Sequence, residues 1–206
     1  MPGFEGAPPV YVAQSHRLEE DGYRMCVLIL GNHAGTHLDA PSHFVASGTD
    51  IETVPLDRCI GEAIVCDFSS KAALEPISAA DLDREAGDVG PGARLLIRTD
   101  WDAHFGRDDY FTDFPPLAPD AAAWFADRRV WLVGVDIPSL HQTEFAQMHT
   151  TMLGAGIAIV ESLANLRALT TRRVFFSSLP IKLTGADGAP VRAVAYDGLP
   201  NGLASD

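Results

Sequence analysis

The chain has 206 residues, of which 47% are hydrophobic and 21% charged, and its formal net charge at pH 7 is −13. This is the composition of an ordinary globular protein that can bury a sizeable core, so we expect one domain over residues 1–206. The acidic balance argues against a nucleic-acid partner, which selects a basic face.

The cysteines and the N-terminal residues indicate where in the cell the protein is expected. Cys26, Cys59 and Cys66 are widely spaced without a Cys-x-x-Cys pair, which argues against a thiolate zinc site or a disulfide framework. Cys66 lies in an apolar stretch and is expected to be a small buried hydrophobe. The first six residues have neither the basic nor the apolar segment of a secretion signal, and no apolar run is long enough for a membrane span. We therefore expect a cytoplasmic protein without a membrane partner.

Apolar runs of strand length alternate with segments that carry helix signals. The predicted strands are 10–13, 24–30, 62–68, 93–99, 130–135, 157–160, 173–179 and 192–195. The predicted helices are 78–85 with Ser78 as N-cap, a helix that starts at Pro119, and 145–154. The alternation indicates the α/β class, and strands without a helix between them near both ends predict a mixed sheet flanked by helices.

Three segments extend this prediction. The apolar strand 24–30 is expected to be buried. The aromatic and charged stretch 100–119 is either a loop over a site or a surface excursion, and the glycines and prolines between 179 and 192 predict a hairpin between two strands.

The most informative segment is 33–43, which places His33, His37, Asp39 and His43 within eleven residues. Neutral imidazole and carboxylate are the side chains that hold catalytic divalent metals. We expect a loop rather than a buried strand, because Gly and Pro interrupt the segment and a buried strand would not tolerate so many polar groups. The alternative is a polar loop whose histidines are solvated.

A second cluster lies downstream. His149 falls on the third predicted helix, and Glu161 follows a predicted strand twelve residues later. This spacing fixes no geometry, so the pattern leaves His149 open as a helix-face histidine and Glu161 as a helix-cap or surface acid.

Residues 33–43 resemble the His-x-Gly-Thr-His-x-Asp-x-Pro-x-His signature of the cyclase family of metal-dependent hydrolases, with every fixed position filled. Bacterial kynurenine formamidases and isatin hydrolases belong to that family. The segments 149–163 and 179–193 are also similar to it. The resemblance implies the swivelling β/β/α fold of the family.

The resemblance also implies the role of each site residue. His33, His37 and Asp39 would bind a first metal, Asp39 would reach a second metal together with His149, and Glu161 would complete a binuclear centre. Two divalent ions per chain are implied, with Zn²⁺ expected and Mn²⁺ as the alternative. His43 would not bind a metal and would act as the general acid/base. The alternatives for His43 are a fourth metal ligand or a residue that contacts the ligands.

The implied activity is hydrolysis of a small amide C–N bond by a hydroxide held on the metals, with proton transfer by His43. The substrate expected first is N-formylkynurenine, which gives kynurenine and formate. The alternative within the class is a cyclic amide such as isatin, or a lactone. The alternative from another class is a non-catalytic metal-binding oligomeric module. The family also implies a homodimer or homotetramer.

Two departures from the family pattern remain. The segment 134–140, with Asp136 and Ser139, is similar to a Gly-x-Asp-x-x-Ser-Leu segment of the family, but His141 stands where an acid is usual. We expect His141 to be a solvated loop residue; the alternatives are a source of metal affinity or a substrate contact. Met1 stands where formamidases have an aromatic residue that contributes to the substrate pocket.

Overall fold

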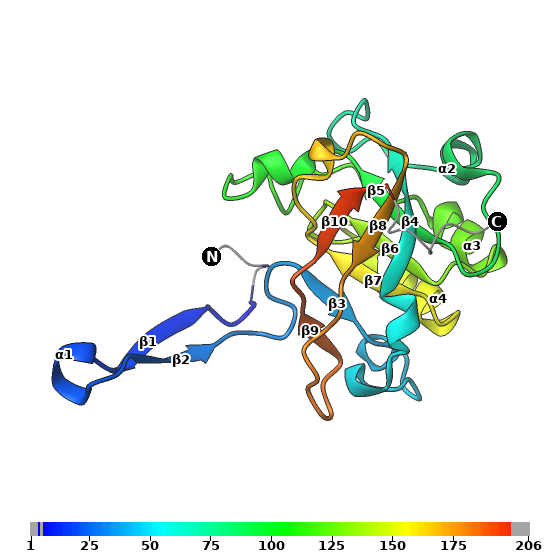
Figure 1. Cartoon of the computed structure of the whole chain (residues 1–206). Coiled ribbons are helices and arrows are strands. Elements are labelled where there is room, and N and C mark those ends of the chain that lie inside the picture. Colours follow the sequence, from blue (N-terminus) through cyan, green and yellow to red (C-terminus); the bar gives the residue numbers. More distant parts are fainter. Residues whose placement is uncertain (1–3, 5, 199–206) are drawn as a thin grey trace.

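The computed structural model describes residue 4 and residues 6–198, so the Met1 position lies outside the described residues. Its centre is an eight-stranded sheet in the order β10-β8-β4-β5-β6-β7-β3-β9 (Figure 1). The sheet strands are β3 (His37–Asp39), β4 (Ile60–Asp67), β5 (Arg94–Arg98), β6 (Leu132–Val135), β7 (Ala158–Glu161), β8 (Arg173–Ser177), β9 (Gly188–Pro190) and β10 (Val194–Asp197). Short 3-10 turns at Pro41–His43, Ile51–Thr53, Leu56–Arg58, Trp101–His104 and Leu166–Ala168 connect these elements.

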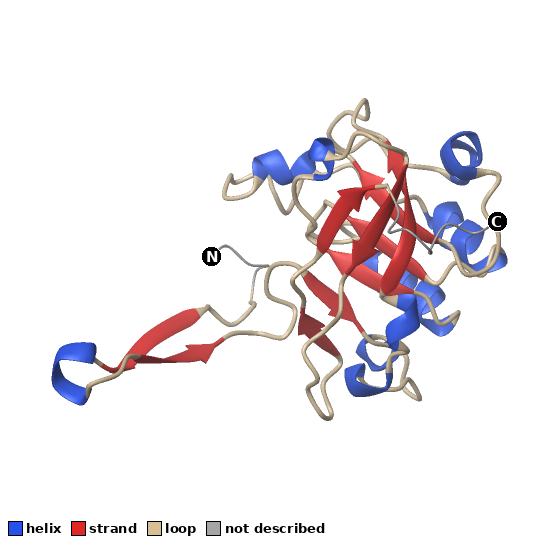
Figure 2. Ribbon diagram, in the orientation of Figure 1, coloured by secondary structure: helices blue, strands red, loops and turns tan. Residues whose placement is uncertain are grey.

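The sheet is mixed, as predicted. Strands β4, β5, β6 and β7 are parallel, whereas β3, β8, β9 and β10 pair antiparallel with their neighbours. The parallel strands are joined by α2 (Ala79–Ala86), α3 (Pro119–Asp127) and α4 (Phe145–Gly154), which lie on one side of the sheet (Figure 2). The predicted N-cap is confirmed, because Ser78 and Asp81 form a capping box at the start of α2. The α/β class predicted from the alternation is thus correct.

Alternation along each strand builds a core on both faces of the sheet. On β5, Leu95 and Ile97 face the helices, whereas Leu96 faces the opposite side. There Leu96 joins Leu38 of β3 and Phe176 of β8 in one buried cluster. Strands from distant places in the sheet order share this cluster because the sheet is curled. Full burial of each such side chain contributes about 1.5–3 kcal/mol.

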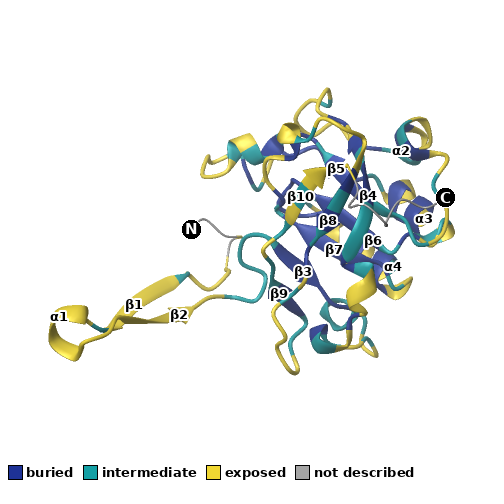
Figure 3. Ribbon diagram, viewed as in Figure 1, coloured by how far each residue is buried: buried dark blue, intermediate teal, exposed yellow. Residues whose placement is uncertain are grey.

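A two-stranded arm projects from this body (Figure 1). It consists of β1 (Tyr11–His16), α1 (Leu18–Asp21) and β2 (Met25–Ile29), with β1 and β2 antiparallel. Every residue of β2 is exposed (Figure 3), so the strand predicted at 24–30 is correct in type and wrong in burial. The reason is that β2 pairs only with β1 and has no second layer to cover either face.

The stretch 100–119, whose last residue starts α3, is not a surface excursion. Trp101, Tyr110, Phe114 and Leu117 are buried in the helix-side core, while Phe105 is exposed. The Tyr110 hydroxyl lies 3.5 Å from Ser162 Oγ, directly after β7. The stretch is therefore anchored beside the end of β7 by its aromatic side chains.

The segment after residue 179 turns back on itself, as the predicted hairpin requires. Pro180 and Val191 form an antiparallel bridge, and the Ile181 N–H donates to the Pro190 carbonyl at 3.4 Å. The returning arm contains β9, which also pairs with β3 at the edge of the sheet, so the hairpin delivers Asp187 to the neighbourhood of β3.

Candidate metal centre

The central element of the site is β3, where a loop was expected. His37, Leu38 and Asp39 form a fully buried strand between β7 and β9. Leu38 points into the inner core, so His37 and Asp39 point to the other face, and Glu161 of β7 lies directly opposite His37. The buried strand tolerates its polar side chains because they pair with one another.

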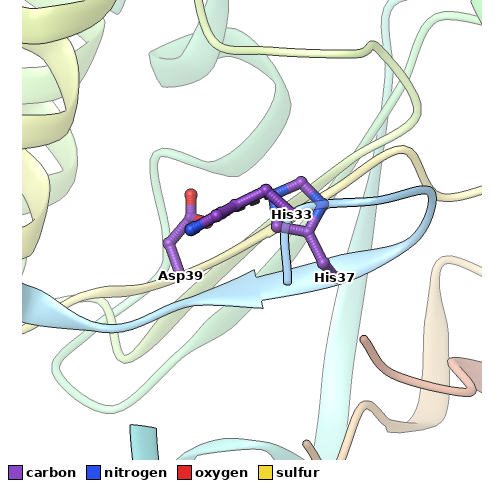
Figure 4. A group of neighbouring side chains, drawn as sticks. All are labelled: His33, His37 and Asp39. Atoms are coloured by element: carbon purple, nitrogen blue, oxygen red, sulfur yellow. Dashed lines mark hydrogen bonds and ion pairs between the residues drawn. The ribbon is translucent and has the colours of Figure 1, made fainter. Parts of the chain in front are cut away.

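Five side chains converge at this point. His33 Nδ1 lies 2.8 Å and His37 Nε2 3.2 Å from Asp39 Oδ1 (Figure 4). His149 Nε2 lies 3.5 Å from Asp39 Oδ2 and 3.1 Å from Glu161 Oε1. Two of the groups of side chains that could hold a metal ion, His33–His37–Asp39 and Asp39–His149–Glu161, thus share the Asp39 carboxylate; they are called the ligand groups below.

The remaining ring nitrogens are held by other acceptors. His37 Nδ1 lies 2.8 Å from the carbonyl of Gly35, and His149 Nδ1 lies 2.7 Å from the carbonyl of Phe145 one turn earlier in α4. An N–H donated to a backbone carbonyl leaves the other nitrogen, which faces the carboxylates, free to bind a cation. His149 is therefore more than a helix-face histidine, and Glu161 is neither a cap nor a surface acid.

The electrostatics of the cluster favour added positive charge. Burial lowers the pKa of His37 and His149, but the neighbouring carboxylates of Asp39 and Glu161 outweigh burial and raise these pKa values to about 9 and about 10. The pKa of His33 is raised in the same way. Burial raises the pKa of Asp39, yet the surrounding imidazoles, His37 first, hold it well below its usual range.

A divalent cation fits this arrangement. Asp39 Oδ2 is buried and makes no hydrogen bond, and an unpaired buried carboxylate oxygen is costly unless a charge satisfies it. The donors are imidazole nitrogens and carboxylate oxygens without thiolate, a set that suits zinc and manganese. The residues present therefore fit the metals that the sequence predicts.

His43 lies beside the cluster at the end of the Pro41–His43 turn. Its ring stacks on His33, with centroids 3.9 Å apart, and its centroid lies 6.0 Å from that of His149. Its side chain is 26% exposed, and burial lowers its pKa. A lowered pKa favours the neutral form of the ring, which is the form that can accept a proton.

Sequence reasoning missed Asp187. Its Oδ2 lies 2.8 Å from His43 Nδ1 and 3.2 Å from His33 Nε2. The signal in the sequence is the adjacent Gly188, where an added Cβ would lie 2.6 Å from His33 Cε1 and 2.9 Å from the Leu38 carbonyl oxygen. Only glycine lets this strand approach His33 so closely.

The segment 134–140 lies outside the ligand cluster. Asp136 is buried, and its carboxylate accepts hydrogen bonds from the backbone N–H groups of Thr99 and Asp100. It therefore organises the turn after β5. His141 lies in a loop, as expected, but is half-buried: its Nδ1 accepts the backbone N–H groups of Thr143 and Glu144 and so caps the turn before α4.

The raised histidine pKa values give a test of the electrostatics. In metal-stripped protein, the folded-state pKa values of His37 and His149 exceed the ordinary value of about 6.5. Their stabilising contribution is complete below that value and is lost as the pH rises through about 9–10. We expect the melting temperature in EDTA to fall between pH 7 and pH 10.

The zinc-loaded protein is the control for this measurement. Deprotonation strengthens metal binding, so the melting temperature with zinc should fall less over the same range. An equal decrease in melting temperature with pH in zinc and in EDTA would contradict the assignment of these histidines to a cation-binding cluster.

The geometry defines a class of protein: an α/β fold with a buried histidine–carboxylate cluster where β3 and β7 meet α4. The comparisons with known proteins specify the class further. The family model described as "Putative cyclase" matches residues 4–142. The kynurenine formamidase of Salinibacter ruber is 33% identical over 87% of this chain and 82% of its own length. The chain belongs to the cyclase family.

Other relatives agree with this assignment. The isatin hydrolase of Roseibium aggregatum is 28% identical over 93% of this chain and 82% of its own length. A solved structure described as a potential metal-dependent hydrolase with cyclase activity aligns with a TM-score of 0.81 at 28% identity, over 97% of this chain and 93% of that chain. An isatin hydrolase structure bound to thioisatinate, 24% identical, aligns with a TM-score of 0.85 over 92% and 82% of the two chains and confirms the fold.

Proposed function

We propose that this chain is a metal-dependent hydrolase of a small amide C–N bond. The observation that carries the proposal is the shared Asp39 carboxylate, whose two oxygens face two separate groups of ligand atoms. His33, His37 and Asp39 would hold one divalent ion, and Asp39, His149 and Glu161 a second. Zn²⁺ is the proposed metal, with Mn²⁺ as the alternative.

The protein residues would transfer the proton and orient the metal ligands. Bound divalent ions supply Lewis acidity, which lowers the pKa of water and polarises a carbonyl. His43 is placed at the solvent side of the cluster, where it takes the proton from the attacking water and returns it to the leaving nitrogen. The hydrogen bonds from His37 to Gly35 and from His149 to Phe145 keep the ligand rings oriented while this happens.

The proposed substrate is N-formylkynurenine. The proposal is supported by the identity to several kynurenine formamidases and by aromatic side chains beside the cluster. The Phe44 ring stacks on His149, with centroids 4.7 Å apart, and lies 6.2 Å from Phe145, which is 44% exposed. An aryl group can pack against this pair while its amide faces His43. A cyclic amide such as isatin is the second candidate, because an isatin hydrolase matches over a similar share of the chain.

The test is a parallel assay of the zinc- and manganese-loaded protein on both substrates, N-formylkynurenine and isatin. We expect release of kynurenine and formate, with the higher kcat/KM on the formamide. Higher kcat/KM on isatin would select the second candidate. Metal binding without turnover of either substrate or of simple aryl formamides would favour a non-catalytic metal-binding module.

We also propose that the chain forms a homo-oligomer, a dimer or tetramer, through the arm 11–29. An isolated two-stranded hairpin is only marginally stable in water, and this one exposes apolar side chains on both faces. Val12 and Leu28 are 66% and 63% exposed on one face, and Tyr11 and Ile29 are each 57% exposed on the other. Val12 and Leu28 are cross-strand partners. A second copy of the chain would remove this surface from water.

The arm yields a prediction for solution size. The double variant Val12→Asp/Leu28→Asp should shift the protein from oligomer to monomer in analytical ultracentrifugation, because two charges cannot be buried at an apolar interface. The control is Leu56→Asp, which changes a leucine on the body of the protein that is 57% exposed. An oligomer that survives in the arm variant would assign the interface to another surface.

The location proposed for the protein is the cytoplasm. All three cysteines are free, including the buried Cys59 and Cys66, which suits a reducing compartment. None of the helices in the described part of the chain has the length and apolar character needed to cross a bilayer.

A further inference from the structure

We infer that Asp187 is a positioning residue that fixes the tautomer and orientation of the His43 ring and couples it to the metal ligand His33. The inference rests on the proposed function for the role of His43, but its structural part stands on contacts of Asp187 alone. The residue comes from the loop before β9, far in sequence from both histidines.

One carboxylate oxygen serves both rings. Asp187 Oδ2 lies 2.8 Å from His43 Nδ1 and 3.2 Å from His33 Nε2, and these two rings stack at an interplanar angle of 22°. His33 faces Asp39 with its other nitrogen, Nδ1. The Asp187 carboxylate therefore fixes the orientation of the His33 ring, a proposed metal ligand, relative to the His43 ring, the proposed acid/base.

The contact determines which nitrogen of His43 is available. A carboxylate only accepts hydrogen bonds, so His43 must carry its proton on Nδ1 to make this bond. Its Nε2 then has an unprotonated lone pair, and no protein partner occupies it among the described residues. A general base needs this form of the ring, with the basic nitrogen free for the attacking water. Without Asp187, the ring can rotate and exchange tautomers.

Asp187 is itself held in place from two sides. Asn32 Nδ2 donates to Asp187 Oδ1 at 2.5 Å, and the backbone N–H of Ala40 donates to the Asp187 carbonyl at 2.9 Å. Hydrogen bonds from His43 and Asn32 outweigh the effect of partial burial and lower the pKa of Asp187 to about 2. The carboxylate is thus a fixed, ionised acceptor. Its side chain is 42% exposed, so a substitution there creates no large cavity.

The first experiment compares wild type with Asp187→Ala in the zinc-loaded full chain. We expect kcat to fall about 10- to 100-fold, as for removal of partners that orient ligating histidines, while KM changes less than about threefold. In ¹H–¹⁵N NMR of the histidine rings, with His43 assigned from the His43→Ala spectrum, the Nδ1–H form should dominate in wild type and give way to mixed tautomers in Asp187→Ala. Asn32→Ala should shift both readouts in the same direction by a smaller amount, and the exposed Asp108→Ala is the control.

The outcomes separate this inference from the proposed function. Unchanged kcat together with an unchanged His43 tautomer in Asp187→Ala would overturn the inference, as would an Nε2–H tautomer in wild type. If Asp187→Ala does not fold, Asn32→Ala decides by the same two readouts. A wild-type protein without hydrolase activity would defeat the proposed function, and the ring NMR would still decide whether Asp187 sets the tautomer.

Discussion

Substitution Asp39→Asn is expected to abolish metal binding at both halves of the centre and, with it, hydrolysis. The Asp39 carboxylate is buried, its Oδ1 faces His33 and His37, and its Oδ2 faces His149. A neutral amide removes the negative charge of the carboxylate that both ligand groups share. Loss of a residue that hydrogen-bonds to a metal ligand already weakens metal binding about 10- to 100-fold. Loss of the shared Asp39 carboxylate should therefore weaken metal binding by more than about 100-fold.

The measurement is zinc affinity by competition with a chelator, together with the rate of formamide hydrolysis. The matched control is Asp108→Asn, which makes the same chemical change at an exposed position and should leave both values unchanged. Retention of one tightly bound ion in Asp39→Asn would show that the two ligand groups act independently. The shared role of Asp39 would then be wrong.

Substitution His43→Ala should separate chemistry from metal binding. We expect a loss in kcat of about 10²- to 10⁴-fold, the usual contribution of a general acid/base, with metal content unchanged. The reason is geometric: His43 stacks on the ligand His33, but its own Nδ1 faces Asp187 and not Asp39.

The control for His43→Ala is His141→Ala, a half-buried histidine that lies outside the ligand cluster. Its activity should stay within about twofold of wild type, since it only caps a turn. Loss of zinc in His43→Ala would instead make His43 a ligand, an arrangement for which His33, His43 and Asp187 have suitable atoms.

The sequence was sufficient to predict the ligand types and most elements. The α/β class and the three helices follow from hydrophobic periodicity and capping residues, and the density of His33, His37 and Asp39 indicates a metal site. The structure also brings together His149 and Glu161, although their spacing in the sequence predicts no particular geometry. Their convergence depends on the strand order, because β7 must lie beside β3 for Glu161 to face His37.

Other features could not be predicted, for physical reasons. Periodicity cannot recognise a strand of three residues such as β3, and some partners of its buried polar groups, Glu161 and His149, lie far away in the sequence. The same limit applies to β9, and therefore to Asp187. The apolar run at 24–30 is read correctly as a strand, but hydrophobicity cannot distinguish a strand buried in a core from one in a projecting arm.

The central claim is that two segments far apart in sequence, residues 33–39 and residues 149–161, form one binuclear centre. The most direct measurement is elemental analysis of metal per chain in protein purified without chelator, for wild type and for Glu161→Ala. The account predicts about two zinc or manganese ions per wild-type chain, a number set by the two ligand groups, and a clear decrease in the variant. One ion or none, unchanged in Glu161→Ala, would contradict it and leave the downstream residues with a purely structural role.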